Sequence, residues 1–284
     1  MSSSSASLPA VPSVVCVGEI TIDRYLDLGR DTVGGISLNV AVNARRCGAG
    51  RVGLVSCVGD DAGGALARAK LSREGVEAAH VSTLPGATAR QDIRMLPGGE
   101  RLFPPGGYHS GVLADLRLTP ADIAYVRGFD LAVVPIFRQI EHIARAVLED
   151  AAFAGRRAAD FLDGSDLGAG LRGIEAYLPH LDLAFVSGDA TAVEMLAPIA
   201  RESRTLIVVT LGAEGSVALS GAERVFQPAA PAPDPVDTTG AGDAFQAAFA
   251  LAYLAHGDIR RALAAGAKRA AQVIGHYGAT DDQP

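Results

Sequence analysis

The chain has 284 residues, of which 49% are hydrophobic, and this is enough for one large domain or two small ones. Its formal net charge is −7 and its basic residues form no stripe, which argues against partners such as nucleic acid or a membrane surface. The three cysteines, Cys16, Cys47 and Cys57, form no CxxC pair and no even set, so we expect a reducing, cytoplasmic location.

The first twelve residues, MSSSSASLPAVP, contain no positive region before an apolar core, so they do not read as a signal peptide. Their composition predicts a disordered leader over residues 1–12. We expect the folded domain to occupy residues 13–284. No apolar run in the chain approaches the ~20 residues that a membrane-spanning helix needs.

Short apolar runs alternate with amphipathic or Ala-rich segments from residue 13 onward. The runs are rich in Val, Ile and Leu on both faces, which is typical of buried parallel strands. The alternation predicts an α/β fold, a doubly wound and mainly parallel sheet flanked by helices. The expected strands are 13–19, 51–59, 130–137, 157–161, 181–187 and 205–212, and the expected helices are 37–47, 62–74, 139–154, 190–202, 241–256 and 258–275.

Two stretches, 20–34 and 88–112, interrupt this succession of strands and helices. They show a weak alternation of apolar and polar residues and contain turn residues. They predict either a small β lid beside the main sheet or a pair of ordinary surface hairpins. Several polar residues and glycines fall at the carboxyl ends of expected strands, where ligands bind in such sheets.

Residues 237–245 read DTTGAGDAF and lead into an Ala-rich helix. The free amides and dipole of a helix N-terminus attract phosphate, and glycines let the phosphate approach. A carboxylate here would repel that phosphate unless it accepted a proton from an attacking nucleophile. The alternative is an ordinary loop that Thr239 caps, with Asp243 favourable in the first helical turn.

Three separated motifs together resemble the ribokinase-like, or PfkB, carbohydrate kinases. They are GGISLNVAVNARRCGA at 34–49, VGDDAGGALARAKLSREGV at 58–76, and DTTGAGDAF. The resemblance covers about residues 13–280. Local similarity to the fructoselysine 6-kinase branch lies in RLF…GGYHSGVLADLRLTPAD at 101–122, LPHLDLAFVSG at 178–188 and IGHYGAT at 274–280.

The resemblance implies ATP-dependent phosphorylation of a primary hydroxyl on a sugar or sugar derivative. Asp243 would be the catalytic base, and Gly240, Ala241 and Gly242 would form an anion hole for the transferred phosphoryl group. The substrate-binding positions would be Asp23, Gly34, Gly35 and Asn39. A charged substituent of the substrate would meet an arginine, for which Arg90 is chosen and the alternatives are Arg94 and Arg101 on the lid and Arg138 at a strand end.

The remaining implied positions concern the nucleotide and metal ions. Thr210, Gly212 and Gly215 match the nucleotide loop. A monovalent cation, K⁺, would be held by Asp237 and Thr239, with Gly278 nearby.

The sequence departs from the family pattern after the expected strand 181–187. An Asn-x-x-Glu motif that places Mg²⁺ is replaced, because Ser187 and Ala190 stand at its two positions. Asp160, Asp163 and Asp189 are then the candidates to hold Mg²⁺ through water, and Asp160 is chosen among them. The stretch VVPIFRQI lacks an acid, and Ile36 replaces a lysine that often follows the Gly pair, so ribose is disfavoured.

The expected substrate is a fructosamine such as fructoselysine. Fructokinase, ketodeoxygluconate kinase and nucleoside kinase are alternatives within the family. The altered Asn-x-x-Glu motif leaves one alternative of another class, a catalytically inactive sensor that binds sugar or nucleotide. The expected partners are a small-molecule sugar and ATP, and lid sheets of this kind can also pair in a homodimer.

Overall fold

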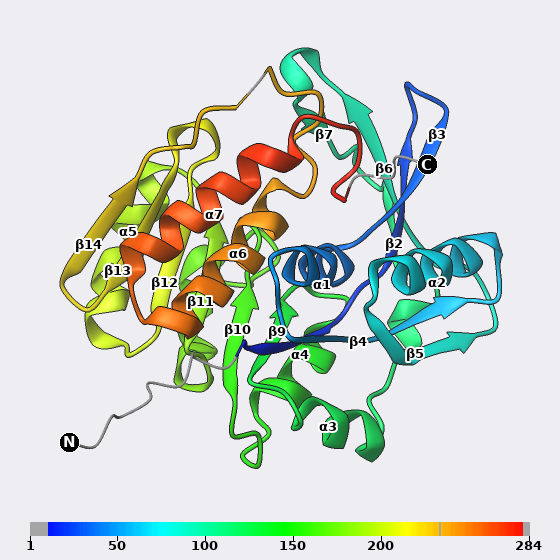
Figure 1. The fold of residues 1–284 in the computed structure, drawn as a ribbon, viewed down its shortest axis with the longest axis horizontal. Coiled ribbons are helices and arrows are strands. Elements are labelled where there is room, and N and C mark those ends of the chain that lie inside the picture. Colours follow the sequence, from blue (N-terminus) through cyan, green and yellow to red (C-terminus); the bar gives the residue numbers. More distant parts are fainter. Residues whose placement is uncertain (1–10, 233, 281–284) are drawn as a thin grey trace, which may run out of the picture.

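The computed structural model describes residues 11–232 and 234–280 (Figure 1). Apart from its last two positions, the predicted leader 1–12 lies outside the described residues. No helix in the described ranges is long and apolar enough to cross a membrane.

A nine-stranded sheet forms the centre of the molecule, in the order β14-β13-β12-β11-β10-β9-β1-β4-β5. Every neighbouring pair from β12 to β5 is parallel. At the other edge, β13 pairs antiparallel with β12, and β14 pairs antiparallel with β13. This arrangement confirms the predicted doubly wound, mainly parallel sheet. The strands are β1 (Ser13–Val17), β4 (Arg51–Gly59), β5 (Glu77–Leu84), β9 (Leu131–Pro135), β10 (Arg156–Asp160), β11 (Leu183–Ser187), β12 (Leu206–Thr210), β13 (Ser216–Ser220) and β14 (Glu223–Gln227).

Helices cover both faces of this sheet because its strands are apolar on both sides. In β1, Val14 and Cys16 belong to the hydrophobic cluster that contains residues of α1, α2, α6 and α7, whereas Val15 and Val17 belong to the cluster on the other face. The helices are α1 (Ile36–Arg46), α2 (Ala62–Glu74), α3 (Pro120–Val126), α4 (Glu141–Leu148), α5 (Ala190–Glu202), α6 (Ala241–His256) and α7 (Ile259–Val273), with short 3₁₀ helices η1 (Pro97–Gly99), η2 (Gly111–Asp115), η3 (Gly170–Ala176), η4 (Leu178–His180) and η5 (Gly212–Glu214).

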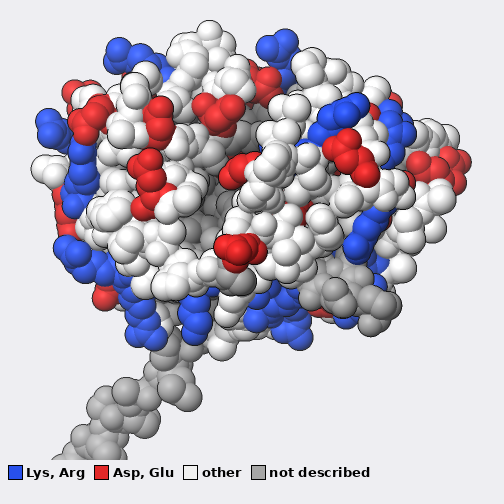
Figure 2. Space-filling view, turned by 90° about the horizontal axis from the view of Figure 1, so that it is seen from above, with Lys and Arg blue, Asp and Glu red and all other residues white. Residues whose placement is uncertain are grey.

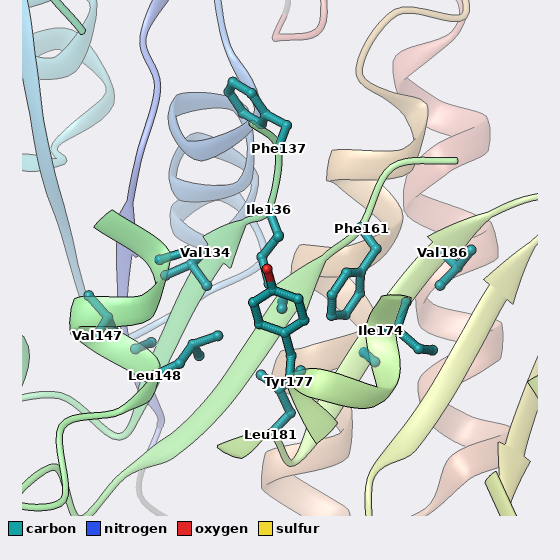
Figure 3. Close-up of a cluster of buried hydrophobic side chains, with 14 of the residues drawn as sticks. Val134, Ile136, Phe137, Val147, Leu148, Phe161, Ile174, Tyr177, Leu181 and Val186 are labelled. Atoms are coloured by element: carbon teal, nitrogen blue, oxygen red, sulfur yellow. The ribbon is translucent and has the colours of Figure 1, made fainter. Parts of the chain in front are cut away.

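The second cluster packs beneath α4 and the 3₁₀ helices η3 and η4 (Figure 3). Phe161 meets Tyr177 edge to face there, with ring centroids 5.6 Å apart. The helix α4 is shorter than the expected 139–154. It ends at Leu148 because the Asp150 carboxylate accepts a hydrogen bond from the Ala152 amide at 3.2 Å and the chain turns toward Phe153.

A second sheet stands beside the carboxyl edge of the first (Figure 1). Its strand order is β3-β2-β6-β7, and β8 also pairs with β6. The stretches 20–34 and 88–112 supply all of these strands. They are β2 (Thr21–Tyr25), β3 (Arg30–Gly34), β6 (Ala89–Met95), β7 (Arg101–Leu102) and β8 (Tyr108–His109).

Candidate active site

A cavity of about 480 Å³ lies where the carboxyl ends of the central strands face the second sheet. The view from above shows a hollow in this face with acidic side chains around it (Figure 2). The described residues that line the cavity include one Lys or Arg side chain, Arg101, and six acidic ones. The acidic residues are Glu19, Asp23, Asp160, Asp163, Asp166 and Asp243.

Asp243 lies in the first turn of α6 and is buried, with 8% of its surface exposed. Its Oδ2 accepts a hydrogen bond from Nδ2 of Asn39 at 2.8 Å. Burial, and next the negative charge of Asp160, raise the pKa of Asp243 to about 7, although Asn39 and Arg101 act in the opposite direction. The carboxylate is therefore a stronger base than an exposed aspartate, whose pKa is about 3.9.

The loop before Asp243 requires glycine. Gly240 has φ +77°, and a Cβ on it would lie 2.2 Å from Cβ of Ala279. A Cβ on Gly242 would meet no atom within 4 Å, so the start of α6 is open to the cavity that both glycines line. The Ala241 amide donates to Thr238 O at 3.3 Å. An open helix N-terminus of this kind fits a phosphate group.

The glycine pair that precedes α1 gives room to the Asp23 carboxylate and to the backbone after β1. A Cβ on Gly34 would lie 2.0 Å from Oδ2 of Asp23, and Gly35 adopts φ +100°. Asp23 is buried on β2 and accepts a hydrogen bond from Oγ1 of Thr21 at 2.7 Å. Burial raises the pKa of Asp23 to about 6. The side chain is placed to accept hydrogen bonds from a ligand in the cavity.

Glu19 lines the same cavity and was not identified from the sequence. It lies two residues after the end of β1 and is 6% exposed. Its carboxylate accepts hydrogen bonds from the Ile36 amide at 3.1 Å and from the Tyr108 hydroxyl of β8 at 3.2 Å. Burial raises the pKa of Glu19 to about 7. The signal that could have revealed it is an acid at a strand end, the same signal that identified Asp23.

Asp160 ends β10 and is also buried against the cavity. Its Oδ2 accepts from Nε2 of Gln246 at 2.7 Å, its Oδ1 accepts from the Leu162 amide at 2.9 Å, and burial raises its pKa. No group of three or more His, Cys, Asp or Glu side chains among the described residues is arranged to hold a metal ion. Mg²⁺ is commonly bound by one or two carboxylates with water and substrate phosphates, and the Asp160 side chain lines the cavity.

Asp237, Thr239 and Gly278 come together beside the start of α6. The fully buried Asp237 carboxylate accepts hydrogen bonds from the Tyr25 hydroxyl at 2.5 Å, the Thr239 amide at 2.8 Å and the Gly278 amide at 2.9 Å. A carboxylate offers about four acceptor positions, so one is left for a cation.

The structure does not place Arg90 with the other predicted substrate residues. Gln91 and Ile93 on β6 face the cavity, whereas Arg90 alternates to the other side, where its Nε lies 3.4 Å from Oδ1 of Asp92. Arg101 on β7 reaches the cavity instead and donates to Oγ1 of Thr238 at 2.9 Å.

The predicted nucleotide residues Thr210, Gly212 and Gly215 lie outside the residues that line this cavity, at the end of β12 and in the turn after it. They adjoin the cavity through Ser187, which pairs with Thr210 across β11 and β12 and lines the cavity.

Comparison with known proteins gives consistent results. The chain is 35% identical over 274 residues to fructoselysine 6-kinase of Escherichia coli (strain K12), covering 94% of this chain and 99% of that enzyme. It is 28% identical over 276 residues to the fructosamine kinase of Bacillus subtilis (strain 168), covering 94% and 92%.

Solved structures share the fold. Adenosine kinase from Sinorhizobium meliloti has a TM-score of 0.78 at 23% identity, with 96% of this chain and 97% of that one covered. Arabidopsis thaliana ribokinase complexed with ribose and ATP has a TM-score of 0.77 at 21% identity, with 95% of each chain covered. Residues 11–284 match the model of the pfkB family carbohydrate kinases. The chain therefore belongs to the pfkB family of carbohydrate kinases and is an ATP-dependent sugar kinase.

Proposed function

We propose that this kinase phosphorylates the terminal primary hydroxyl of a fructosamine such as fructoselysine. The observation that carries the proposal is the 35% identity to fructoselysine 6-kinases across 94% of this chain and 99% of theirs. The acidic cavity supports it, because a fructosamine contains a basic amine.

Asp243 would accept the proton of the primary hydroxyl as the hydroxyl oxygen attacks the γ-phosphorus. A pKa of about 7 suits this task near neutral pH. Asn39 would orient the carboxylate through its 2.8 Å hydrogen bond. Gly240 and Gly242 would expose the amides at the start of α6 to the charge that develops on the phosphoryl oxygens, with Ala241 shaping the same turn. ATP supplies the phosphoryl group, and Mg²⁺ offsets its charge.

Asp23, Gly34, Gly35 and Asn39 would contact the sugar. The second sheet would close over it as a lid, which excludes water and limits wasteful ATP hydrolysis. Solution scattering with and without sugar tests this closure, and an unchanged radius of gyration would count against it. A homodimer that pairs two such sheets, and a cytoplasmic location, stay predictions.

Thr210, Gly212 and Gly215 would contact the nucleotide, and Asp160 would hold Mg²⁺ through water. Asp237 and Thr239, with Gly278 close by, would ligate K⁺ beside the start of α6. Assays in which choline replaces K⁺ test this cation site, and unchanged turnover would remove K⁺ from the proposal.

The deciding experiment measures ADP release with ATP and Mg²⁺ against fructoselysine, other glycated amino acids, fructose, ribose, ketodeoxygluconate and adenosine. We expect the highest kcat/KM with a glycated amino acid. The panel includes fructose because a fructokinase of Klebsiella pneumoniae is 34% identical over 245 residues. A preference for any plain sugar or nucleoside would refute the fructosamine proposal and leave the kinase assignment intact.

A further inference from the structure

The cavity holds more negative charge than phosphorylation of a neutral sugar explains. Glu19, Asp23, Asp160 and Asp243 are each at least nine-tenths buried in its wall, and Arg101 is the one Lys or Arg side chain among the described residues that line it. Burying several carboxylates together is unfavourable because each charge loses water and repels the others. Such a cavity favours a ligand that brings positive charge.

Two buried amide groups point to the same kind of ligand. Asn39 donates its Nδ2 to Asp243, and Gln246 donates its Nε2 to Asp160. The oxygens of both amides, Asn39 Oδ1 and Gln246 Oε1, are buried without a hydrogen-bond partner among the described residues. A buried acceptor is normally satisfied by a donor. The cavity therefore suits a ligand that is rich in N–H and O–H groups.

Glu19 is the buried carboxylate that phosphoryl transfer leaves without a role. Asp243 is placed to act as base, Asp160 is placed near Mg²⁺, and Asp23 is placed to accept sugar hydroxyls. Glu19 forms no ion pair among the described residues, and its two hydrogen bonds come from neutral donors, the Ile36 amide and the Tyr108 hydroxyl. About two of its four acceptor positions stay available for a ligand.

We propose that Glu19 determines specificity for amino sugars by pairing with the secondary ammonium of the fructosamine, an inference that rests on the function proposed above. A secondary ammonium carries two N–H donors and one positive charge, which matches the free acceptor capacity and the charge of Glu19. Burial raises the pKa of Glu19 to about 7, and an adjacent ammonium would stabilise the ionised form. A neutral sugar provides no such compensation.

The test compares N-butylfructosamine with the matching butyl ether of fructose, in which oxygen replaces the secondary amine. For the wild-type enzyme, we expect kcat/KM for the amine to exceed that for the ether by ~10–100-fold, the size of a charge-assisted hydrogen bond. Glu19→Gln keeps the shape, its oxygen can still accept from the Ile36 amide, and its NH₂ group can donate to the Tyr108 hydroxyl oxygen. It should lower the amine-to-ether ratio at least ~10-fold, mainly through KM for the amine.

A control variant separates this contact from other effects. Asp166→Asn removes an exposed charge at the cavity and keeps Glu19 with both of its hydrogen bonds. It should leave the amine-to-ether ratio within about twofold, because exposed charges are strongly screened. Turnover of the ether by each variant reports that the variant is folded.

The outcomes distinguish the two proposals. If the wild-type enzyme phosphorylates fructosamines but Glu19→Gln leaves the ratio unchanged, Glu19 only positions the second sheet, and this inference alone is refuted. The same holds if Asp166→Asn lowers the ratio as much as Glu19→Gln does, because the effect is then a general field. If the wild-type enzyme phosphorylates plain sugars and no fructosamine, the proposed function and this inference are both refuted.

Discussion

Replacing Asp243 with asparagine should inactivate the kinase and stabilise its fold above neutral pH. The Asp243 carboxylate is buried beside Asp160, so the folded protein holds a proton there more tightly than the unfolded chain does. Because the pKa of Asp243 is raised in the folded protein, protonation of this carboxyl favours the folded state. Its contribution to the free energy of unfolding is fully present below about pH 4 and is lost as pH rises through about 7. Asparagine has the same shape and carries no charge, and its amide oxygen can still accept from Asn39.

The size of the effect follows from the two pKa values. A pKa of 3.8 in the unfolded chain and about 7 in the folded protein destabilises the wild-type fold by roughly 1.5 kcal/mol at pH 5 and roughly 4 kcal/mol at pH 8.5. The variant lacks this pH dependence. Its advantage in free energy of unfolding should therefore grow by about 2–3 kcal/mol between these pH values. Loss of a general base should lower kcat by ~100–10,000-fold.

Urea unfolding at pH 5 and pH 8.5 measures the first effect, and ADP release with the preferred sugar measures the second. A matched control is Asp61→Asn, which changes the residue that caps α2 by accepting from the Gly64 amide at 2.8 Å. Although burial raises the pKa of Asp61, hydrogen bonds from Thr88 and Gly64 bring it below the usual value. Asparagine can still cap α2, but its NH₂ group cannot accept from the Thr88 amide as Oδ2 of Asp61 does at 2.9 Å, so this variant should lose ~1 kcal/mol and keep its kcat. Equal pH dependence of stability in Asp243→Asn and wild type, or near-normal kcat, would refute the reasoning.

Three further predictions concern the same site. A pH profile of wild-type kcat/KM should rise between pH 6 and pH 8, because burial raises the pKa of Asp243 to about 7 and the base must be ionised; a flat profile would exclude Asp243 as the titrating base. Arg101→Gln removes a charge that lowers this pKa, so steady-state assays should find the rise displaced to higher pH, and an unmoved profile would mean that Arg101 does not act on Asp243. Gly34→Ala places a Cβ 2.0 Å from Oδ2 of Asp23, so KM for the sugar should increase ~10-fold or more while KM for ATP changes little; equal changes in both would contradict a local effect on Asp23.

The parts of the fold that could be predicted are those whose burial is uniform along the segment. The runs that became β1, β9, β11 and β12 are apolar on both faces, which identifies a central parallel strand without other information. The edge strand β5, EAAHVSTL, escaped prediction because it alternates between exposed and partly buried residues. The helix α3 was also missed, although Thr119 and Asp122 form a capping box at its start.

The residues of the site could be predicted where a local motif determines the backbone conformation. They could not be predicted where tertiary structure determines which side chains of a strand face the cavity. The glycines before α1 and α6 could be assigned because they belong to local motifs, and in the structure a Cβ on Gly34, Gly35 or Gly240 would approach a neighbouring atom closely. Arg90 was expected at the substrate, but in β6 the alternation of Ala89, Gln91 and Ile93 turns the arginine away from the cavity. That alternation was visible in ARQDIRM. Arg101 was an alternative to Arg90 from the start, but β7 has only two residues and offers no alternation by which to select it.

The positions with unfavourable backbone angles or buried charges are the ones that binding and phosphoryl transfer would require. Gly240 adopts φ +77° and Gly35 adopts φ +100°. The buried carboxylates of Glu19, just after β1, and of Asp160, at the end of β10, lie where apolar residues would be more stable. The uniformly apolar central strands, packed on both faces, stabilise the domain enough to tolerate these sites. Because each carboxylate sits at the end of a rigid strand or helix, its position is set by the sheet rather than by a flexible loop. Ligands that bring cations and donors relieve the repulsion among these carboxylates, so that repulsion contributes directly to substrate recognition.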